Sequence, residues 1–343
     1  MADKQFPVDL LTQMLTIKEH YMVNKELTEI YLKIKYQMVC IPDQIYKAFN
    51  ERQMIFPYPK YVKTLFLNFL VRPDGNFMDC AIFENATKVV PIGLKTEVGV
   101  TKFAIVVKSL RSLTEIVYND YPKSLPGKYI MQGITDCKTL TTLKINGIDE
   151  HLEIINTMPT LTILKIESIT SDQSCKALVH IETLTLAAYT TGLNDKLFLY
   201  FPNVTHLTIS VYPNYKRQSD NLEIFNFDGF SKLTHLSCEG KFEIPKNVVY
   251  LTCENYKSYI LIPPSYRIFK EVTFLLKYEC VRQKRIQESE YQICKDYLKQ
   301  ADFKAKIVIP NNKIYSNYVD IFSRHKYMHS ESNLYLYCCT RTK

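Results

Sequence analysis

A nine-residue pattern recurs along the middle of the chain and constrains its fold more than any other feature. "LTTLKINGI" begins at Leu140 and "LTILKIESI" begins at Leu161, and both have apolar residues at the first, fourth and sixth places. Further copies begin at Val62, Leu113, Ile181, Val204, Leu233, Val248 and Phe269, with a weak one at Thr87. From Leu140 onward the copies start 21, 20, 23, 29, 15 and 21 residues apart. The sequence therefore predicts an array of similar units.

Each unit reads as a strand with one buried face, because its apolar residues alternate over the second half of the pattern. A strand followed by a short variable return, repeated at this interval, is typical of a leucine-rich repeat solenoid. One unit cannot bury its apolar face alone, so stacking must bury it. We expect one interior column of fourth-place residues, Leu143, Leu164, Leu184, Leu207, Leu236 and Leu251. A second interior column comprises the sixth-place residues Ile145, Ile166, Leu186, Ile209, Cys238 and Cys253.

The predicted fold class is α+β, with parallel strands on the concave face of the solenoid. Leucine-rich repeats usually carry Asn or Cys at the ninth place, and here mostly large apolar residues stand there, such as Ile148 and Ile169. An irregular convex side is therefore expected. We predict a helical head over residues 1–58, the repeat array over 59–280 and a terminal segment over 281–343. That last segment reads as a charged helix from Val281 and two strands, Ala305–Pro310 and Asn333–Cys338, which cap or continue the array.

The start of the head resembles an F-box. "FPVDLLTQML" matches the opening of that motif, with Phe6, Pro7, Leu10, Leu11 and Leu15 at its apolar and proline places. F-box heads followed by leucine-rich repeats belong to substrate receptors of ubiquitin ligases. The resemblance implies docking of these residues on a Skp1-type adaptor, with substrate held by the repeats. The alternative is a helical cap that shields the first repeat, as a solenoid end requires.

The strand residues that flank the buried leucines are expected to point into the concave face. The third, fifth and seventh places therefore form three rows on that face. We predict that a protein partner contacts Thr142, Lys144, Lys165, Thr185, His206, Thr208, His235, Tyr250 and Thr252. The two histidines fall in adjacent repeats, about 5 Å apart. A polar contact surface is the preferred interpretation, and no metal site is predicted.

Motifs for catalysis are missing from the sequence. It contains no glycine-rich phosphate loop, no nucleophile elbow and no zinc-protease motif, so no cofactor is predicted and an enzyme with an unrecognised site is a remote alternative. The net charge of +8 over 343 residues comes without a basic block that would indicate nucleic-acid binding. With no apolar run long enough for a signal peptide or a membrane span, we expect an intracellular, cytoplasmic protein, with the nucleus also open. The predicted function is non-catalytic protein–protein interaction, either as a ubiquitin-ligase adaptor or as a plain scaffold.

Overall fold

The computed structural model describes residues 25–41, 58–70, 80–118, 127–147, 152–168, 176–188, 197–211, 227, 229–238, 245–253, 269–275, 304–310, 327–329 and 333–338. The chain divides into two compact units. The first unit carries strands β1 to β5, and the second carries β6 to β14.

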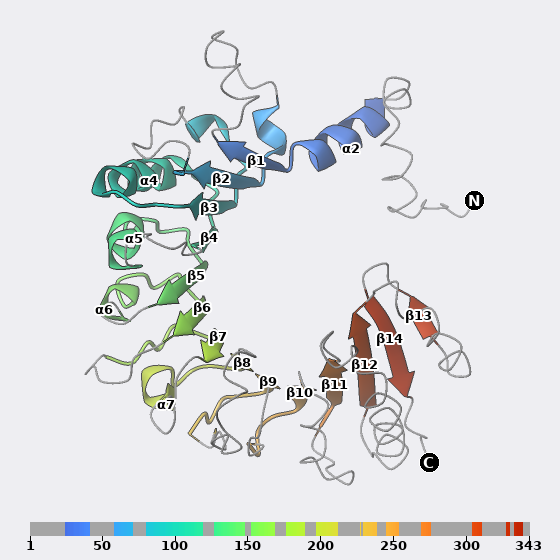
Figure 1. Ribbon diagram of the computed structural model, residues 1–343. Coiled ribbons are helices and arrows are strands. Elements are labelled where there is room, and N and C mark those ends of the chain that lie inside the picture. The colour runs from blue at the N-terminus through green and yellow to red at the C-terminus, as the bar shows by residue number, and fades with distance from the viewer. Residues whose placement is uncertain are drawn as a thin grey trace. The chain divides into compact units, whose positions relative to one another are not determined.

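The first unit is a parallel sheet with strand order β1-β2-β3-β4-β5. Its strands are β1 (Met38–Ile41), β2 (Thr64–Asn68), β3 (Lys88–Ile92), β4 (Glu115–Val117) and β5 (Thr142–Gly147). Helix α2 (Lys25–Lys35) precedes β1, α4 (Glu97–Ser109) joins β3 to β4, and α5 (Gly127–Ile134) joins β4 to β5. Short 3₁₀ turns cover Pro59–Tyr61 and Cys80–Ile82. Figure 1 shows α4 and α5 next to one another on one side of these strands.

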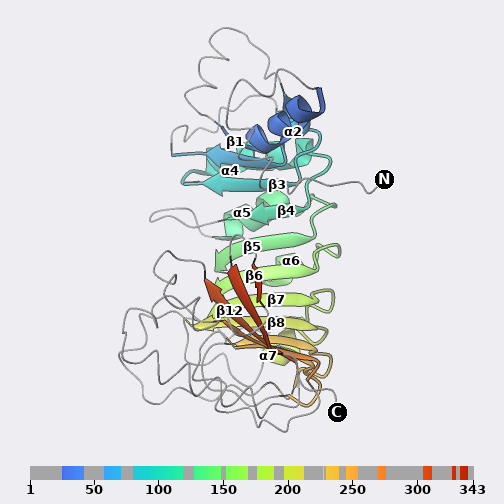
Figure 2. The same cartoon turned by 90° about the vertical axis from the view of Figure 1, so that its right-hand side faces the viewer.

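The second unit has the same kind of parallel arrangement and ends with antiparallel strands. Its parallel strands are β6 (Ile163–Ser168), β7 (Thr183–Ala188), β8 (His206–Val211), β9 (His235–Cys238), β10 (Tyr250–Cys253), β11 (Glu271–Leu275) and β12 (Lys304–Pro310). β14 (Asn333–Cys338) pairs antiparallel with β12, and β13 (Tyr327–His329) pairs antiparallel with β14. The short helices α6 (Leu152–Ile155) and α7 (Leu197–Tyr200) lie in the returns. Figure 2 shows β6, β7 and β8 side by side in this order.

The interior columns predicted from the repeat are confirmed. Leu164 pairs with Leu184 in adjacent parallel strands, and both side chains are fully buried. The other fourth-place residues are equally buried, Leu143 in the first unit and Leu207, Leu236 and Leu251 in the second. The sixth-place residues from Ile145 to Cys253 are at most 2% exposed. Each unit therefore builds its core from the columns that the repeat specifies.

Three details of the predicted organisation are wrong or incomplete. Strand β1 lies inside residues 1–58, which were predicted to be helical, and it pairs in register with β2. Lys88 pairs with the third-place residues Thr64 and Glu115, so Lys88 is itself at a third place. The weak copy of the repeat therefore begins two residues earlier, at the buried Ala86, and not at Thr87. Strand β13 was not predicted. The strands expected at the end of the chain are confirmed as β12, which continues the parallel sheet, and β14, which pairs antiparallel with β12. The helix expected from Val281 lies outside the described residues.

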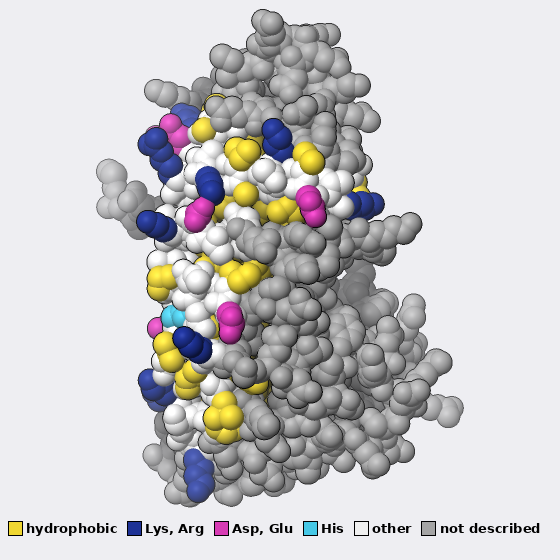
Figure 3. Space-filling view, turned by 90° about the vertical axis from the view of Figure 1, so that its left-hand side faces the viewer, with side chains coloured by type: hydrophobic (Ala, Val, Ile, Leu, Met, Phe, Trp, Pro, Cys, Tyr) yellow, Lys and Arg dark blue, Asp and Glu magenta, His cyan; other side chains and the backbone are white. Residues whose placement is uncertain are grey.

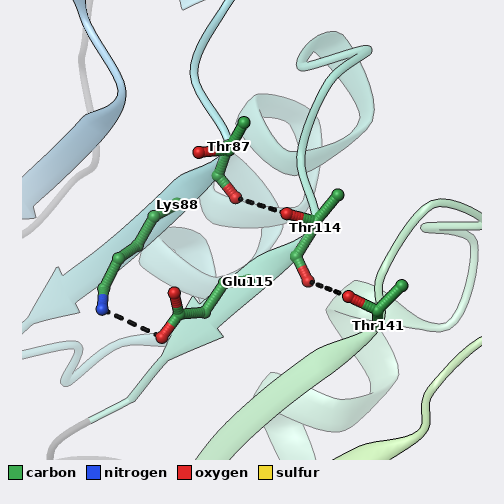
Figure 4. Close-up of polar contacts among 5 residues, drawn as sticks. All are labelled: Thr87, Lys88, Thr114, Glu115 and Thr141. Carbon is green, nitrogen blue, oxygen red and sulfur yellow. Dashed lines mark hydrogen bonds and ion pairs between the residues drawn. The ribbon is translucent and has the colours of Figure 1, made fainter.

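A ladder of threonines at the second place of the repeat joins neighbouring strands (Figure 4). The backbone nitrogens of Thr114 and Glu115 both donate to the carbonyl of Thr87, and those of Thr141 and Thr142 both donate to Thr114. The hydroxyls of Thr114 and Thr141 donate to the same carbonyls, at 3.3 and 3.2 Å. Since each carbonyl accepts from the residue pair that opens the next strand, the ladder sets the register between repeats.

Helix α4 begins with a side-chain cap, and this gives a local test of the return segments. The Thr96 hydroxyl accepts a hydrogen bond from the backbone nitrogen of Gly99 at 3.0 Å. Phe103 and Val107, four residues apart on one face of the helix, are buried. We expect Thr96→Ala to lower the free energy of unfolding by about 0.5–2 kcal/mol, because one amide loses its acceptor. Urea denaturation measures this loss. Thr96→Ser, which keeps the hydroxyl, should lose much less, and equal losses for both would contradict the cap.

The side that carries the helices has scattered apolar side chains among charged ones (Figure 3). The exposed apolar residues outside the strands include Val98, Ile105, Val179 and Leu199. Among the described residues, no helix has the length and apolar character that crossing a membrane requires.

Candidate partner-binding face

The side chains at the third and fifth places point away from the buried columns, and we call the surface they form the outer face. In the second unit the third row contains Ile163, Thr183, His206, His235, Tyr250 and Glu271. The fifth row contains Lys165, Thr185, Thr208, Ser237, Thr252 and Thr273. All of these residues are half-buried or exposed, whereas their neighbours in the strand are buried. The strand period thus separates a continuous surface from the core.

The structure brings most of the predicted partner-binding residues onto this surface. Lys165, Thr185, His206, Thr208, His235, Tyr250 and Thr252 share the outer face of the second unit. Thr142 and Lys144 lie on β5, in the outer rows of the first unit. The predicted adaptor-docking residues Phe6, Pro7, Leu10, Leu11 and Leu15 lie outside the described residues.

Three rings in the third row form a continuous stack. The imidazoles of His206 and His235 are 3.9 Å apart between centroids, with 15° between their planes. The rings of His235 and Tyr250 are 4.3 Å apart, with 9° between their planes. The Lys270 ammonium lies 5.9 Å from the Tyr250 ring centroid, within the range of a cation–π contact. We call His206, His235 and Tyr250 the ring stack.

Second-place threonines determine which nitrogen of each histidine carries the proton. The Thr205 hydroxyl donates to the Glu182 carbonyl at 3.2 Å and lies 2.9 Å from His206 Nδ1. The Thr234 hydroxyl donates to the Thr205 carbonyl at 3.2 Å and lies 2.9 Å from His235 Nδ1. Because each hydroxyl has used its single hydrogen on a carbonyl, it accepts from Nδ1–H. In the neutral form of each imidazole, Nε2 therefore keeps a lone pair.

The stacked geometry suits contact with a partner better than binding of a metal ion. A metal lies close to the plane of the imidazole that binds it, along the nitrogen lone pair. The two rings are stacked, with 3.9 Å between their centroids and 15° between their planes, so one ion cannot lie in both planes. No group of three or more His, Cys, Asp or Glu side chains within the described ranges is arranged to hold a metal.

Burial and a neighbouring imidazole both act on His235. Burial lowers its pKa, and the charge of His206 lowers that pKa further. The pKa of histidine in an unfolded chain is about 6.5. On acidification the unfolded chain therefore binds a proton at this position before the folded protein does. The stabilising contribution of neutral His235 is therefore present above about pH 6.5 and is lost as the pH falls through the folded pKa. Burial also lowers the pKa of His180, which contributes with the same sign.

We expect the free energy of unfolding to fall on acidification, and to fall less steeply in His235→Phe. Phenylalanine keeps a ring between His206 and Tyr250 and does not titrate. The measurement is urea denaturation at a series of pH values from neutral to about one unit below the ordinary histidine pKa. His180→Gln is the comparison variant, since it removes a half-buried histidine whose lowered pKa acts with the same sign, and it leaves the ring stack intact. An unchanged pH slope in His235→Phe would rule out this account of the stack.

The outer face of the first unit has a different character. Lys88 Nζ and Glu115 Oε1 form an ion pair of 2.9 Å between third-place residues of β3 and β4. Its two side chains are 35% and 30% exposed. The fifth row there is largely apolar, with Phe66 half-buried and Val90 buried. Glu115 is thus partnered within the chain, and Thr142 and Lys144 are the predicted contact residues of this unit.

Sequence reasoning missed the residues that organise the ring stack. Thr205, Thr234 and Lys270 occupy second places, which were not assigned to any row of the contact surface. The signal was present, because the tripeptide Thr-His-Leu occurs at 205–207 and again at 234–236.

Comparison with known proteins does not assign this chain to a family. Its sequence matches no model of a protein family, and a search of curated proteins found no match. The function of the outer face is therefore inferred from its geometry.

Proposed function

We propose that this chain is a non-catalytic protein–protein interaction protein of the leucine-rich repeat type, which binds its partner on the outer face of the second unit. The observation that carries the proposal is the ring stack with its adjoining row of hydroxyl side chains. Large side chains are not needed for a solvated sheet face, where threonine alone suffices. Three stacked rings there form a rigid, amphipathic contact area instead.

Interfaces depend on a few anchors, and Tyr and charged residues are common among them. Tyr250 is 37% exposed although one ring face packs against His235, and Lys165 lies in the adjoining row. The threonines and Ser237 of the fifth row supply hydrogen-bond donors and acceptors around these anchors. A rigid sheet that holds aromatic, cationic and hydroxyl groups in register loses little conformational entropy on binding.

The repeat pattern supports the leucine-rich repeat assignment within this proposal. Its first-, fourth- and sixth-place residues are buried in both units, and successive strands are parallel with returns between them. Such arrays bury one side of each strand and leave the other side as a binding surface.

The experiment is capture of binding proteins by the full chain from cells that express it, followed by reconstitution with the purified partner. Capture alone identifies candidates, and the reconstituted complex must then depend on outer-face residues. A partner that binds equally well when Tyr250 and Lys165 are replaced would contradict the proposal.

The adaptor version of this function rests on the F-box-like stretch at residues 6–15. We expect the full chain to bind a purified Skp1-type adaptor, and Leu10→Asp with Leu11→Asp to abolish binding, because two carboxylates replace apolar docking groups. Lys4→Asp with Gln5→Asp is the matched control beside the motif. If the intact chain does not bind the Skp1-type adaptor, the adaptor version is wrong, and the chain is a plain scaffold whose head only caps the array.

A further inference from the structure

The ring stack is covered at one end and uncovered at the other. Lys270 lies over the outer side of the Tyr250 ring. At the opposite end, the third-row neighbour of His206 is Thr183, which has no ring to continue the stack. Side-chain exposure agrees, since His235 has a ring on both sides and is half-buried, whereas His206 is exposed.

A further ring fits the spacing of the row at the Thr183 position. The rings in the stack follow one another at 3.9 and 4.3 Å, so the next step beyond His206 falls above Thr183. On the next strand of the same row, Thr183 is followed by Ile163, which is half-buried. Ile163 and His206 are two strand spacings apart, or about 9.6 Å. A planar group there contacts imidazole on one side and an aliphatic side chain on the other. Such surroundings favour an aromatic side chain.

The charge of Lys165, near the Thr183 position, favours one kind of partner group beside the ring. In the register of β6 and β7, Lys165 lies opposite Thr185, which is two residues after Thr183 on β7. Lys165 belongs to none of the ion pairs among the described residues. A lysine at this distance repels a guanidinium and attracts a carboxylate. Glu182 lies on the other side of Thr183, at the start of the strand, and is exposed. A partner carboxylate is therefore expected on the Lys165 side of the ring.

We propose that the partner inserts an aromatic side chain over Thr183, stacked on His206, with a carboxylate beside it that pairs with Lys165. This inference rests on the proposed function and specifies the chemistry of the partner: a protein segment in which an aromatic residue stands next to an acidic one. The partner ring becomes the fourth ring of the stack.

The test uses the full chain labelled with carbon-13 at the histidine Cε1 atoms, at neutral pH. The probes are three capped dipeptides: acetyl-Asp-Tyr-amide, acetyl-Asp-Leu-amide without the ring, and acetyl-Lys-Tyr-amide with the charge reversed. The His206 signal is identified by its loss in His206→Asn. We expect acetyl-Asp-Tyr-amide to shift this signal upfield by its ring current, and the other two probes to bind about 2–10-fold more weakly, the range that one aromatic pair or one surface ion pair supplies.

Two phenylalanine variants separate the Thr183 position from the rest of the outer face. Thr183→Phe supplies the fourth ring from the chain itself, so it should abolish the shift caused by acetyl-Asp-Tyr-amide. Thr252→Phe is the control, because Thr252 is also half-buried on the outer face but lies on β10, away from Thr183. Lys165→Glu should remove the preference for the acidic probe and keep the preference for the ring.

The outcomes distinguish this inference from the proposed function. Equal affinities of the three dipeptides, no upfield shift with acetyl-Asp-Tyr-amide, or an unchanged response in Thr183→Phe would overturn the inference. If a reconstituted protein partner still depends on Tyr250 in those cases, the proposed function stands with a different contact. If acetyl-Asp-Tyr-amide binds as expected but reconstituted partners ignore the outer face, the proposed function fails.

Discussion

Leu164→Ala is expected to lower the free energy of unfolding by about 2–5 kcal/mol, the cost of truncating a fully buried leucine. Leu164 is fully buried and faces Leu184 of the next strand in the same column. Neighbouring strands of the sheet are held by backbone pairing, so they cannot close the cavity that the truncation leaves. Urea denaturation of the variant and the unmodified chain measures the difference.

Lys165→Ala is the matched control, because the next residue along the same strand points to the outer face. Its effect on the free energy of unfolding should stay within about 0.5 kcal/mol. The two truncations Leu164→Ala and Leu184→Ala should also be non-additive by about 0.5 kcal/mol or more, since the side chains share one cavity. Equal effects of Leu164→Ala and Lys165→Ala would contradict the buried column.

The strands of the array were predictable because their signal is local and periodic. Alternation of apolar and polar residues identifies a half-buried strand, and repetition at nearly constant spacing makes coincidence improbable even for Val204 and Val248, whose copies contain few leucines. The two strands near the end of the chain, β12 and β14, follow the same rule. The sequence did not predict which strands β12 and β14 pair with, because the pairing of β12 with β11 depends on contacts between distant segments.

Strand β1 was missed because its four residues offer too little periodicity. "MVCI" follows directly on the amphipathic helix α2, and the combined stretch reads as helical until the backbone pairing with β2 is known. The one-residue error at Thr87 has a similar cause. Ala86 is small, and only the pairing of Lys88 with Thr64 shows that it occupies an interior first place.

For the candidate site, the sequence could place residues on a face but could not show how they touch. The adjacency of His206 and His235 followed from the repeat register, and it is confirmed by the pairing of β8 with β9. The stacking of both rings with Tyr250, and the proton on each Nδ1, depend on rotamers and on the second-place hydroxyls. Side-chain rotamers have no signal in a periodic pattern, so these features required the structure.

The second large effect is expected at the outer face. Lys165→Glu, His206→Ala and Tyr250→Ala together should weaken binding of the partner about 100-fold or more, because anchors of an interface each contribute on the order of 2 kcal/mol and tenfold in affinity corresponds to about 1.4 kcal/mol. The three residues are half-buried or exposed and point away from the core. The variant should therefore remain folded, with an unfolding transition close to that of the unmodified chain.

A matched variant also changes three residues, all of them outside the outer face. Lys102→Glu, Lys176→Glu and Leu199→Ala alter two lysines and one exposed apolar residue, all on segments between the strands. These replacements should leave the affinity for the partner within about twofold, since most residues outside the anchors of an interface contribute little.

The most direct test of recognition by the outer face is isothermal titration calorimetry of the purified partner against the unmodified chain, the outer-face variant and the matched variant. The account predicts similar dissociation constants for the unmodified chain and the matched variant, and a dissociation constant about 100-fold higher or more for the outer-face variant. Equal affinity of all three for the partner would contradict it.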